Sequence, residues 1–158
     1  MAEAWDAIAA GYAQRAAPFT GSFAPELLAA AGVGTGDGSG GGACVRSVCD
    51  VAAGSGAFAL AAAVAAGVHR VSACDISPGM LAELAASAAA ALPASAASID
   101  TAVCSATALP YPTGSFDAVV SNFGVIFAPD LPAGLASHRR DYHSAALSSL
   151  FGRCCNVR

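Results

Sequence analysis

The chain has 158 residues, of which 56% are hydrophobic and 11% are charged, so it can form one domain with a core and is too apolar for a disordered protein. All its basic residues are arginines and the net charge is −4, which argues against a nucleic-acid or anionic-membrane surface as the main function. We expect a small-molecule partner and no bound nucleic acid.

The six cysteines are interpreted as free thiols in a reducing compartment, and no metal site is expected. Four lie in short apolar runs typical of buried strands, while the last two are adjacent and lack the spacing of a zinc site: Cys44, Cys49, Cys74, Cys104, Cys154 and Cys155. The acidic N-terminus is not typical of a secretory signal, and the longest apolar run, residues 57–68, is too short to span a bilayer. We expect an intracellular protein, cytoplasmic unless it is targeted to an organelle.

Two helices and a glycine-rich segment are predicted before the first strand. Trp5, Ile8 and Tyr12 recur at helical spacing in "AWDAIAAGYAQRA", and Pro25 begins a second helix through "ELLAAAG". Residues 34–42 lack the Gly-Lys-Ser/Thr ending of a phosphate-binding loop and lead into a strand, which favours a flexible connector. We divide this part of the chain into N-terminal cap helices over residues 1–33 and a linker over residues 34–43.

From residue 44 onward, apolar strands alternate with helices. The predicted strands and helices are 45–51, about 57–66, 71–76, about 78–92, 99–104 and a strand beginning at Phe116. Near-continuous apolar strands separated by helices pair in parallel within a sheet that is covered on both faces. The sequence therefore predicts an α/β fold with a doubly wound, Rossmann-like parallel sheet.

The turn in "VCDVAAGSGAFALAAA" is a candidate ligand site. A strand that ends near Asp50 and turns through Gly54 and Gly56 into a helix directs backbone N–H groups and the positive helix end to one point. The glycines would let a ligand approach the main chain. A turn of this kind can also connect a strand to a helix without binding anything.

Asp75 lies at the end of the next predicted strand, in "VSACDISPGML". A carboxylate at this position can accept hydrogen bonds from both hydroxyls of a ribose held over the first turn. Ser77 and Pro78 already supply an N-cap and a first-turn residue for the following helix, which weakens the alternative that Asp75 is only a cap. These features allow either an NAD domain or an adenosylmethionine domain.

Three motifs in order make a family resemblance specific: Asp50 with "AAGSG", then "DISPGML", then "ALPYPTGSFDAVVSNFGVIFAPD". Together they resemble the class I S-adenosylmethionine-dependent methyltransferases, and most closely the subgroup with the ubiquinone/menaquinone C-methyltransferases and general small-molecule methyltransferases. The opening "WDAIAAGYAQ" is similar to the helix that caps the cofactor there. The resemblance covers about residues 4–131 and implies methyl transfer from S-adenosyl-L-methionine to a small-molecule acceptor.

The resemblance also implies cofactor contacts. Residues of the glycine-rich turn would surround the methionine and ribose, Asp75 would bind the ribose hydroxyls, and the remaining residues would lie along the adenine or face the reacting methyl. The cofactor-binding set is Asp50, Ala52, Gly54, Gly56, Asp75, Ile76, Met80, Ser105, Ala106 and Asn122, with Ser121 and Phe123 beside Asn122. Ala52 replaces a glycine common in the family, and Ser105 replaces an aspartate beside the adenine amino group. A hydroxyl is a weaker acceptor than a carboxylate, so we expect reduced cofactor affinity.

The end of the chain departs from the resemblance. After "FAPD" the family continues with a helix and three more strands, whereas this chain reads "LPAGLASHRRDYHSAALSSLFGRCCNVR", in which no strand-like apolar run is apparent. We interpret residues 44–131 as the cofactor-binding half of a methyltransferase domain and residues 132–158 as an atypical, disordered tail of a C-terminally truncated sequence. The sheet would be incomplete, with strand order 3-2-1-4, and its exposed fourth strand would favour self-association.

Two hypotheses stay open. The first is an S-adenosylmethionine-dependent enzyme, although turnover by this chain is in question because the acceptor side of the pocket would be missing. The second is a non-catalytic remnant that binds the cofactor weakly or pairs with another protein through the open sheet edge. An NAD-dependent oxidoreductase is a distant third, because an NAD domain has no reason to carry "LPYPTGSFDAVVSNFG". We assign no catalytic residue.

Overall fold

The computed structural model describes residues 1–34, 45–130, 132 and 142–148. Its elements in chain order are α1 (Ala2–Arg15), α2 (Ala17–Gly21), α3 (Ala24–Ala30), β1 (Ser47–Val51), α4 (Ala57–Ala63), β2 (Arg70–Asp75), α5 (Pro78–Ala91), β3 (Ser98–Val103), β4 (Phe116–Asn122), the 3-10 helix η1 (Val125–Phe127) and β5 (Tyr142–Ser148). The predicted linker lies outside the described residues except for Gly34. Helix α2 was not predicted, because five residues carry no readable periodicity.

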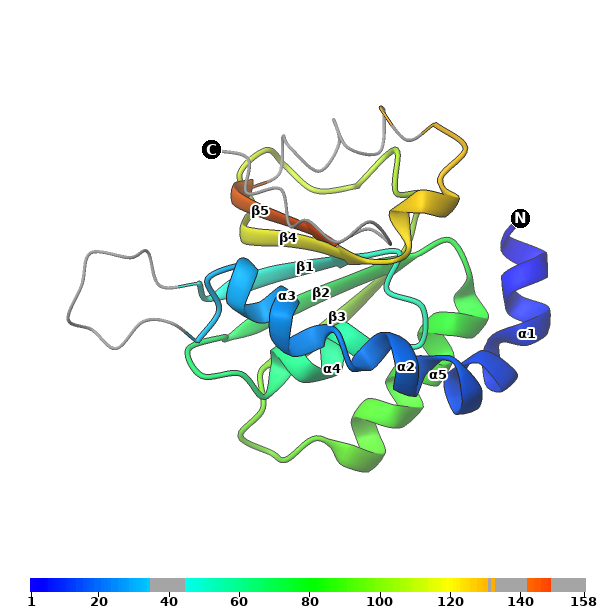
Figure 1. Cartoon of the computed structure of the whole chain (residues 1–158), viewed down its shortest axis with the longest axis horizontal. Coiled ribbons are helices and arrows are strands. Elements are labelled where there is room, and N and C mark those ends of the chain that lie inside the picture. The colour runs from blue at the N-terminus through cyan, green and yellow to red at the C-terminus, as the bar shows by residue number, and fades with distance from the viewer. Residues whose placement is uncertain (35–44, 131, 133–141, 149–158) are drawn as a thin grey trace.

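The strands form one parallel sheet in the order β3-β2-β1-β4-β5 (Figure 1). The predicted α/β fold and the predicted order of the first four strands are confirmed. Successive residues of β1 face opposite sides, since Val48 packs in one core cluster and Cys49 in another. Helices α3, α4 and α5 cover the first side, and the segment after β3, with Leu109 and Tyr111, packs on the second.

The fifth strand corrects two predictions. Residues 142–148 of the supposed tail form β5, which pairs in parallel with β4 from Phe116↔Tyr142 to Asn122↔Ser148. The fourth strand is therefore not an exposed edge, and the proposed self-association through it has lost its basis. The sequence did not predict this strand because "YHSAALS" has no long apolar run. Pairing in a parallel sheet uses backbone N–H and C=O groups, which this segment supplies whatever its side chains are. Apart from Pro132, the remainder of the predicted tail lies outside the described residues.

The free-thiol prediction is confirmed for three cysteines, Cys49, Cys74 and Cys104. Cys49 and Cys74 are fully buried on neighbouring strands, where they act as small apolar residues in the second core cluster. The other three cysteines lie outside the described residues. No helix in the described ranges is long and apolar enough to cross a membrane.

Candidate functional site

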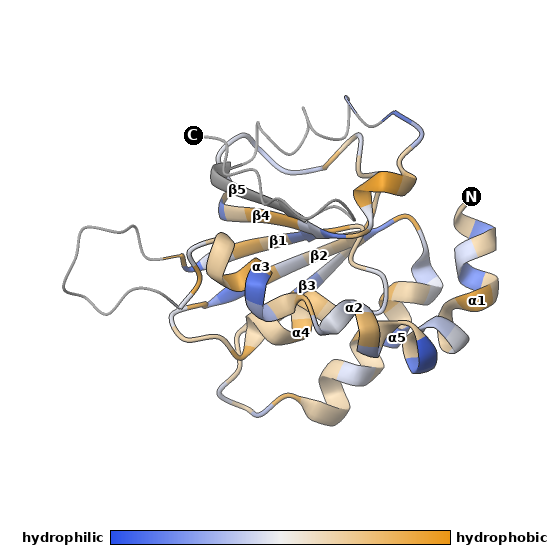
Figure 2. Ribbon diagram, in the orientation of Figure 1, coloured by the Kyte–Doolittle hydropathy of each residue, from blue (hydrophilic) through white to orange (hydrophobic). Residues whose placement is uncertain are grey.

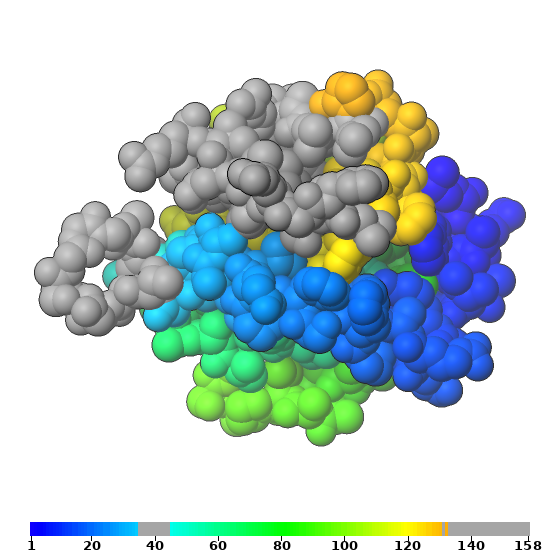
Figure 3. Space-filling view, in the orientation of Figure 1, coloured from blue at the N-terminus to red at the C-terminus, as the bar shows by residue number. Residues whose placement is uncertain are grey.

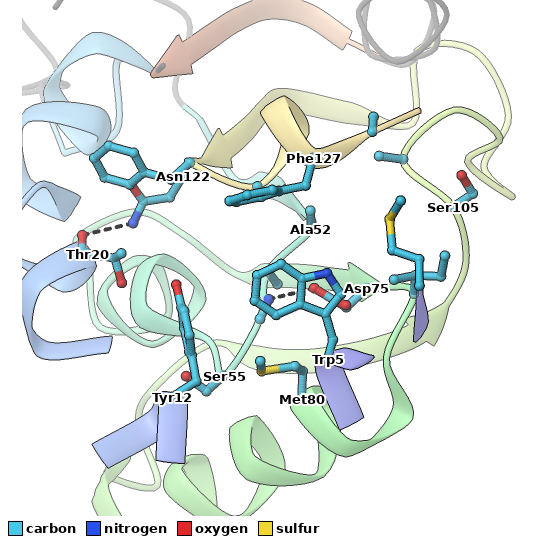
Figure 4. Close-up of a pocket in the computed structure, with 18 of the residues that line it drawn as sticks. Trp5, Tyr12, Thr20, Ala52, Ser55, Asp75, Met80, Ser105, Asn122 and Phe127 are labelled. Carbon is cyan, nitrogen blue, oxygen red and sulfur yellow. Dashed lines mark hydrogen bonds between the residues drawn. The ribbon is translucent and has the colours of Figure 1, made fainter. Parts of the chain in front are cut away.

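A pocket lies at the carboxyl ends of β1, β2 and β4, where open parallel sheets bind their ligands (Figure 4). It contains about 860 Å³ of space, including its open mouth. Its walls come from the N-terminal helices, the turn after β1, the end of β2 with the start of α5, the loop after β3, and the segment after β4. The lining residues are Met1, Trp5, Tyr12, Thr20, Ala52, Ala53, Gly54, Ser55, Ala57, Asp75, Ile76, Met80, Cys104, Ser105, Ala106, Asn122, Phe123, Gly124, Phe127, Ala128 and Pro129.

Eight of the ten predicted cofactor-binding residues line this pocket. They come from four separate segments of the chain: Ala52, Gly54, Asp75, Ile76, Met80, Ser105, Ala106 and Asn122. The other two, Asp50 and Gly56, are not part of the lining. The structure thus brings the three sequence motifs together at one edge of the sheet.

The turn after β1 adopts the left-handed backbone that the glycines allow. Gly54 has φ 56° and Gly56 has φ 87°, and Ala52 shares this region at φ 54° although it carries a Cβ. The segment after β4 lies directly against this turn, because a Cβ added to Gly124 would come within 2.5 Å of the Ala52 carbonyl oxygen. Two loops that end neighbouring strands therefore form one continuous wall of the pocket.

Asp75 is held in place by two backbone donors. The Gly54 N–H donates to Asp75 Oδ2 over 2.8 Å, and the Ser77 N–H donates to Asp75 Oδ1 over 2.9 Å. The residue is only 7% exposed but lines the pocket. Each carboxylate oxygen has room for more than one hydrogen bond, so both can still accept from a ligand. Asp75 is a preoriented pair of acceptors facing the pocket.

Asp50 lies below the pocket instead of in its wall. It is 1% exposed, and neither carboxylate oxygen has a hydrogen-bond partner among the described residues. Burial raises the pKa of Asp50 from 3.8 to about 8; the nearby backbone N–H of Ala59 opposes this rise, and the charge of Asp75 adds a smaller part to it. At neutral pH its carboxyl group is therefore mainly protonated.

Gly56 has a packing role. A Cβ at this position would overlap the side chain of Leu84, which is fully buried on α5. The glycine therefore lets the start of α4 approach α5 closely, and it sets the turn by accommodating a left-handed backbone.

The expected adenine side of the pocket is formed by Ile76, Met80, Ser105 and Ala106. Ile76 is 37% exposed, whereas Met80 is buried at the base of the wall. The Ser105 hydroxyl pairs with the Thr107 hydroxyl at 2.8 Å and accepts from the Thr107 N–H at 3.2 Å. This hydroxyl is partly used within its own turn, which weakens it further as a replacement for a carboxylate.

The end of β4 and the segment after it supply polar and aromatic groups. Asn122 Nδ2 donates to the Thr20 carbonyl oxygen over 2.9 Å, while its buried Oδ1 has no partner in the described part of the chain. Phe123 has a left-handed backbone, φ 62°, and its ring contacts the Phe23 ring at 5.0 Å between centroids. Ser121 is fully buried and accepts from the Val125 N–H, so it does not reach the pocket.

Aromatic residues that are far apart in the sequence meet across the pocket. Trp5 of α1 makes edge-to-face contacts with Tyr12, at 6.1 Å between ring centroids, and with Phe127 of η1, at 5.2 Å. Figure 2 shows that η1 is strongly hydrophobic, and Figure 3 shows the N-terminal helices running beside the segment after β4. Trp5 and Tyr12 were foreseen as parts of a capping helix, but Thr20 and Phe127 were missed because their spacing carries no signal.

The sequence also matches a known family. Residues 48–141 match the methyltransferase domain family. Among curated proteins, an uncharacterized protein of Mycobacterium tuberculosis is 46% identical over 82 residues, which cover 52% of this chain and 28% of that protein. The chain thus spans less than a third of this relative.

Solved structures show the same fold. A putative S-adenosyl-L-methionine-dependent methyltransferase from Methanococcus maripaludis superimposes with a TM-score of 0.68 at 19% identity, over 96% of this chain and 64% of that one. A putative methyltransferase from Bacillus halodurans gives 0.66 at 19% identity, over 80% and 50%. The family match covers more than half of the chain and supports S-adenosylmethionine as the cofactor. The chain belongs to the methyltransferase domain family.

Proposed function

We propose that the chain binds S-adenosyl-L-methionine in this pocket and takes part in methyl transfer to a small-molecule acceptor. The observation that carries the proposal is Asp75, whose two oxygens are oriented by the backbone N–H groups of Gly54 and Ser77 at the pocket wall. A ribose presents two adjacent hydroxyl donors, and a fixed carboxylate is the complementary acceptor.

The other groups in the pocket fit the parts of this cofactor. The Ser55 hydroxyl is buried in the lining and has no hydrogen-bond partner among the described residues, so it is available to the polar methionine end. Ile76 and Met80 offer apolar surface to the adenine. Asp75 is the acidic residue of the lining and would bind the ribose. The residues present therefore match the cofactor, with Ser105 as the weakest member.

S-adenosylmethionine supplies a methyl group on a positively charged sulfur. The protein's contribution is to hold the acceptor atom in line with that methyl and to exclude water. The aromatic rings of Trp5, Tyr12 and Phe127 close over the pocket, and Asn122 offers its unpartnered Oδ1 beside them. We place the acceptor beside these rings and Asn122.

The finer proposal concerns the acceptor. The sequence resemblance favours a molecule of the kind used by the ubiquinone/menaquinone-type and general small-molecule methyltransferases. The aromatic lining is consistent with a mainly apolar acceptor without charge. An NAD-dependent reaction is disfavoured by the family match.

Calorimetry with S-adenosylhomocysteine tests the binding step. We expect Asp75→Asn to weaken binding about tenfold or more. The amide replaces one acceptor oxygen with an NH2 donor, whereas the ribose hydroxyls and the N–H groups of Gly54 and Ser77 all require acceptors. The control is Asp100→Asn on β3, an exposed aspartate away from the pocket, which should bind as the original chain does. No heat from folded protein at millimolar ligand would overturn the cofactor proposal.

Methyl transfer to quinone and phenolic acceptors tests the reaction itself. Incorporation of a labelled methyl group that is lost in Asp75→Asn supports the enzyme. Tight binding of S-adenosylhomocysteine with no transfer to any acceptor would instead support the non-catalytic alternative. Binding of NAD in place of S-adenosylhomocysteine would contradict both.

A further inference from the structure

The carboxylate of Asp6 joins helix α1 to the start of α5, where the two helices also pack against each other at Ala9 and Gly79. Asp6 Oδ1 accepts a hydrogen bond from the Ser77 hydroxyl at 2.5 Å and another from the Gly79 N–H at 2.8 Å. These hydrogen bonds lower the pKa of Asp6, so the group is ionised at neutral pH. Both partners lie more than seventy residues away in the chain.

The contact completes the first turn of α5. Pro78 has no N–H, the Gly79 N–H donates to Asp6, and the Met80 N–H donates to the Ser77 hydroxyl. A helix start otherwise leaves these donors without partners and attracts negative charge. Asp6 therefore acts as a cap supplied by another helix.

Gly79 makes the close approach possible. A Cβ at Gly79 would lie 2.9 Å from Asp6 Oδ1 and 3.3 Å from the Asp6 Cα. Any larger residue at this position would push α1 away from the start of α5. The aspartate and the glycine thus form a matched pair in the interface between the two helices.

The helix held in this way covers the pocket. Trp5, the residue before Asp6, lines the pocket and contacts Phe127 on the opposite wall, while Tyr12 lines the pocket about two helical turns further along α1 (Figure 4). The Asp6 hydrogen bonds therefore hold the part of α1 that carries Trp5, beside the packing of the buried Ala9 on the same helix. Asp6 itself does not line the pocket, so its hydrogen bonds support this wall from outside.

Ser77 links this contact to the cofactor-binding carboxylate. Its hydroxyl donates to Asp6, and its N–H donates to Asp75 Oδ1. We propose that Asp6 is a positioning residue that holds α1 as a lid over the pocket, and that lid closure and ligand binding at Asp75 reinforce each other through Ser77. The coupling part rests on the proposed function, whereas the lid part does not.

Trp5 is the only tryptophan of the chain, so its fluorescence reports on the lid directly. In Asp6→Ala we expect a red-shifted emission and stronger quenching by acrylamide. The affinity for S-adenosylhomocysteine should fall on the order of fivefold, the effect of losing one cap. The unfolding midpoint in urea is measured alongside, so that a general loss of structure is recognised.

Two further variants separate a positioning role from a merely structural one. Asp6→Asn keeps an oxygen acceptor at Oδ1, so it should restore most of the quenching and affinity of the original chain. Gly79→Ala should resemble Asp6→Ala, and it should add little in the Asp6→Ala background, where no carboxylate remains to be displaced. Glu3→Ala removes an exposed acid of the same helix and should change nothing.

Unchanged Trp5 emission and quenching in both Asp6→Ala and Gly79→Ala would overturn the lid. More exposed Trp5 with unchanged affinity would keep the lid and overturn the coupling. If the original chain fails to bind S-adenosylhomocysteine at all, the proposed function and the coupling both fail, while the fluorescence of the variants still decides the lid.

Discussion

The two halves of the pocket are built differently. The half at the ends of β1 and β2 is held by backbone groups, such as the N–H groups that fix Asp75, and its supporting residues are buried. The half formed by α1 and η1 consists of side-chain rings, and Phe127 is 51% exposed there. Backbone hydrogen bonds and packing make a rigid wall, whereas a few exposed contacts make a movable one. Changes in the first half should alter stability, and changes in the second should alter access.

The largest expected effect tests the rigid half at Gly56. In Gly56→Ala the new methyl group overlaps Leu84 and the backbone must stay left-handed, so we expect the free energy of unfolding to fall by about 3 kcal/mol. Urea denaturation measures it. Gly34→Ala is a matched control, since Gly34 has φ 74° with nothing within 4 Å. Equal losses in the two variants would show that packing between α4 and α5 is not the cause.

The next effect concerns the buried carboxyl of Asp50. Because its folded pKa is raised from 3.8 to about 8, the folded state keeps a proton that the unfolded state loses, and stability falls as pH rises through this window. Between pH 6 and pH 7 this proton should lower the free energy of unfolding by about 1.4 kcal/mol. In Asp50→Asn this part of the slope should disappear.

The comparison is made by measuring unfolding free energies of both proteins at the two pH values. Asp100→Asn, an exposed aspartate, should retain the slope of the original chain. A slope that survives unchanged in Asp50→Asn would assign the pH dependence to other groups and leave Asp50 ionised in the fold.

The smallest effect sharpens the comparison within the turn itself. Ala52 is held at φ 54°, a left-handed backbone that glycine adopts without the penalty of about 1–2 kcal/mol that a Cβ brings. Because glycine also costs about 0.5–1 kcal/mol in chain entropy, Ala52→Gly should raise the free energy of unfolding by only about 0.5–1 kcal/mol. Ala53→Gly is the neighbouring control without a positive φ, and it should lower stability by about 0.5–1 kcal/mol through chain entropy. The same sign for both substitutions would contradict strain at Ala52.

The sequence by itself determined the elements whose signals lie within a few neighbouring residues. The strand, glycine turn and helix around Gly54, and the N-cap of α5 at Ser77, follow from local periodicity and backbone preference. The order of the first four strands in the sheet was predicted from the fold of the family that the motifs resemble. Eight of the ten predicted pocket residues were found in the lining for the same reason.

The tertiary structure alone decided the contacts between distant segments. The pairing of β5 with β4, the bond from Asn122 to Thr20 and the contact of Asp6 with α5 join residues with no common local pattern. The structure also showed that Asp50 is buried outside the pocket lining. The direction of its side chain depends on the alternation of side chains along β1, whereas a sequence motif indicates only that the residue lies close to the site. The lining residues of the glycine turn, β2 and the loop after β3 were therefore predictable from the sequence, whereas the position of α1 over the pocket required the tertiary structure.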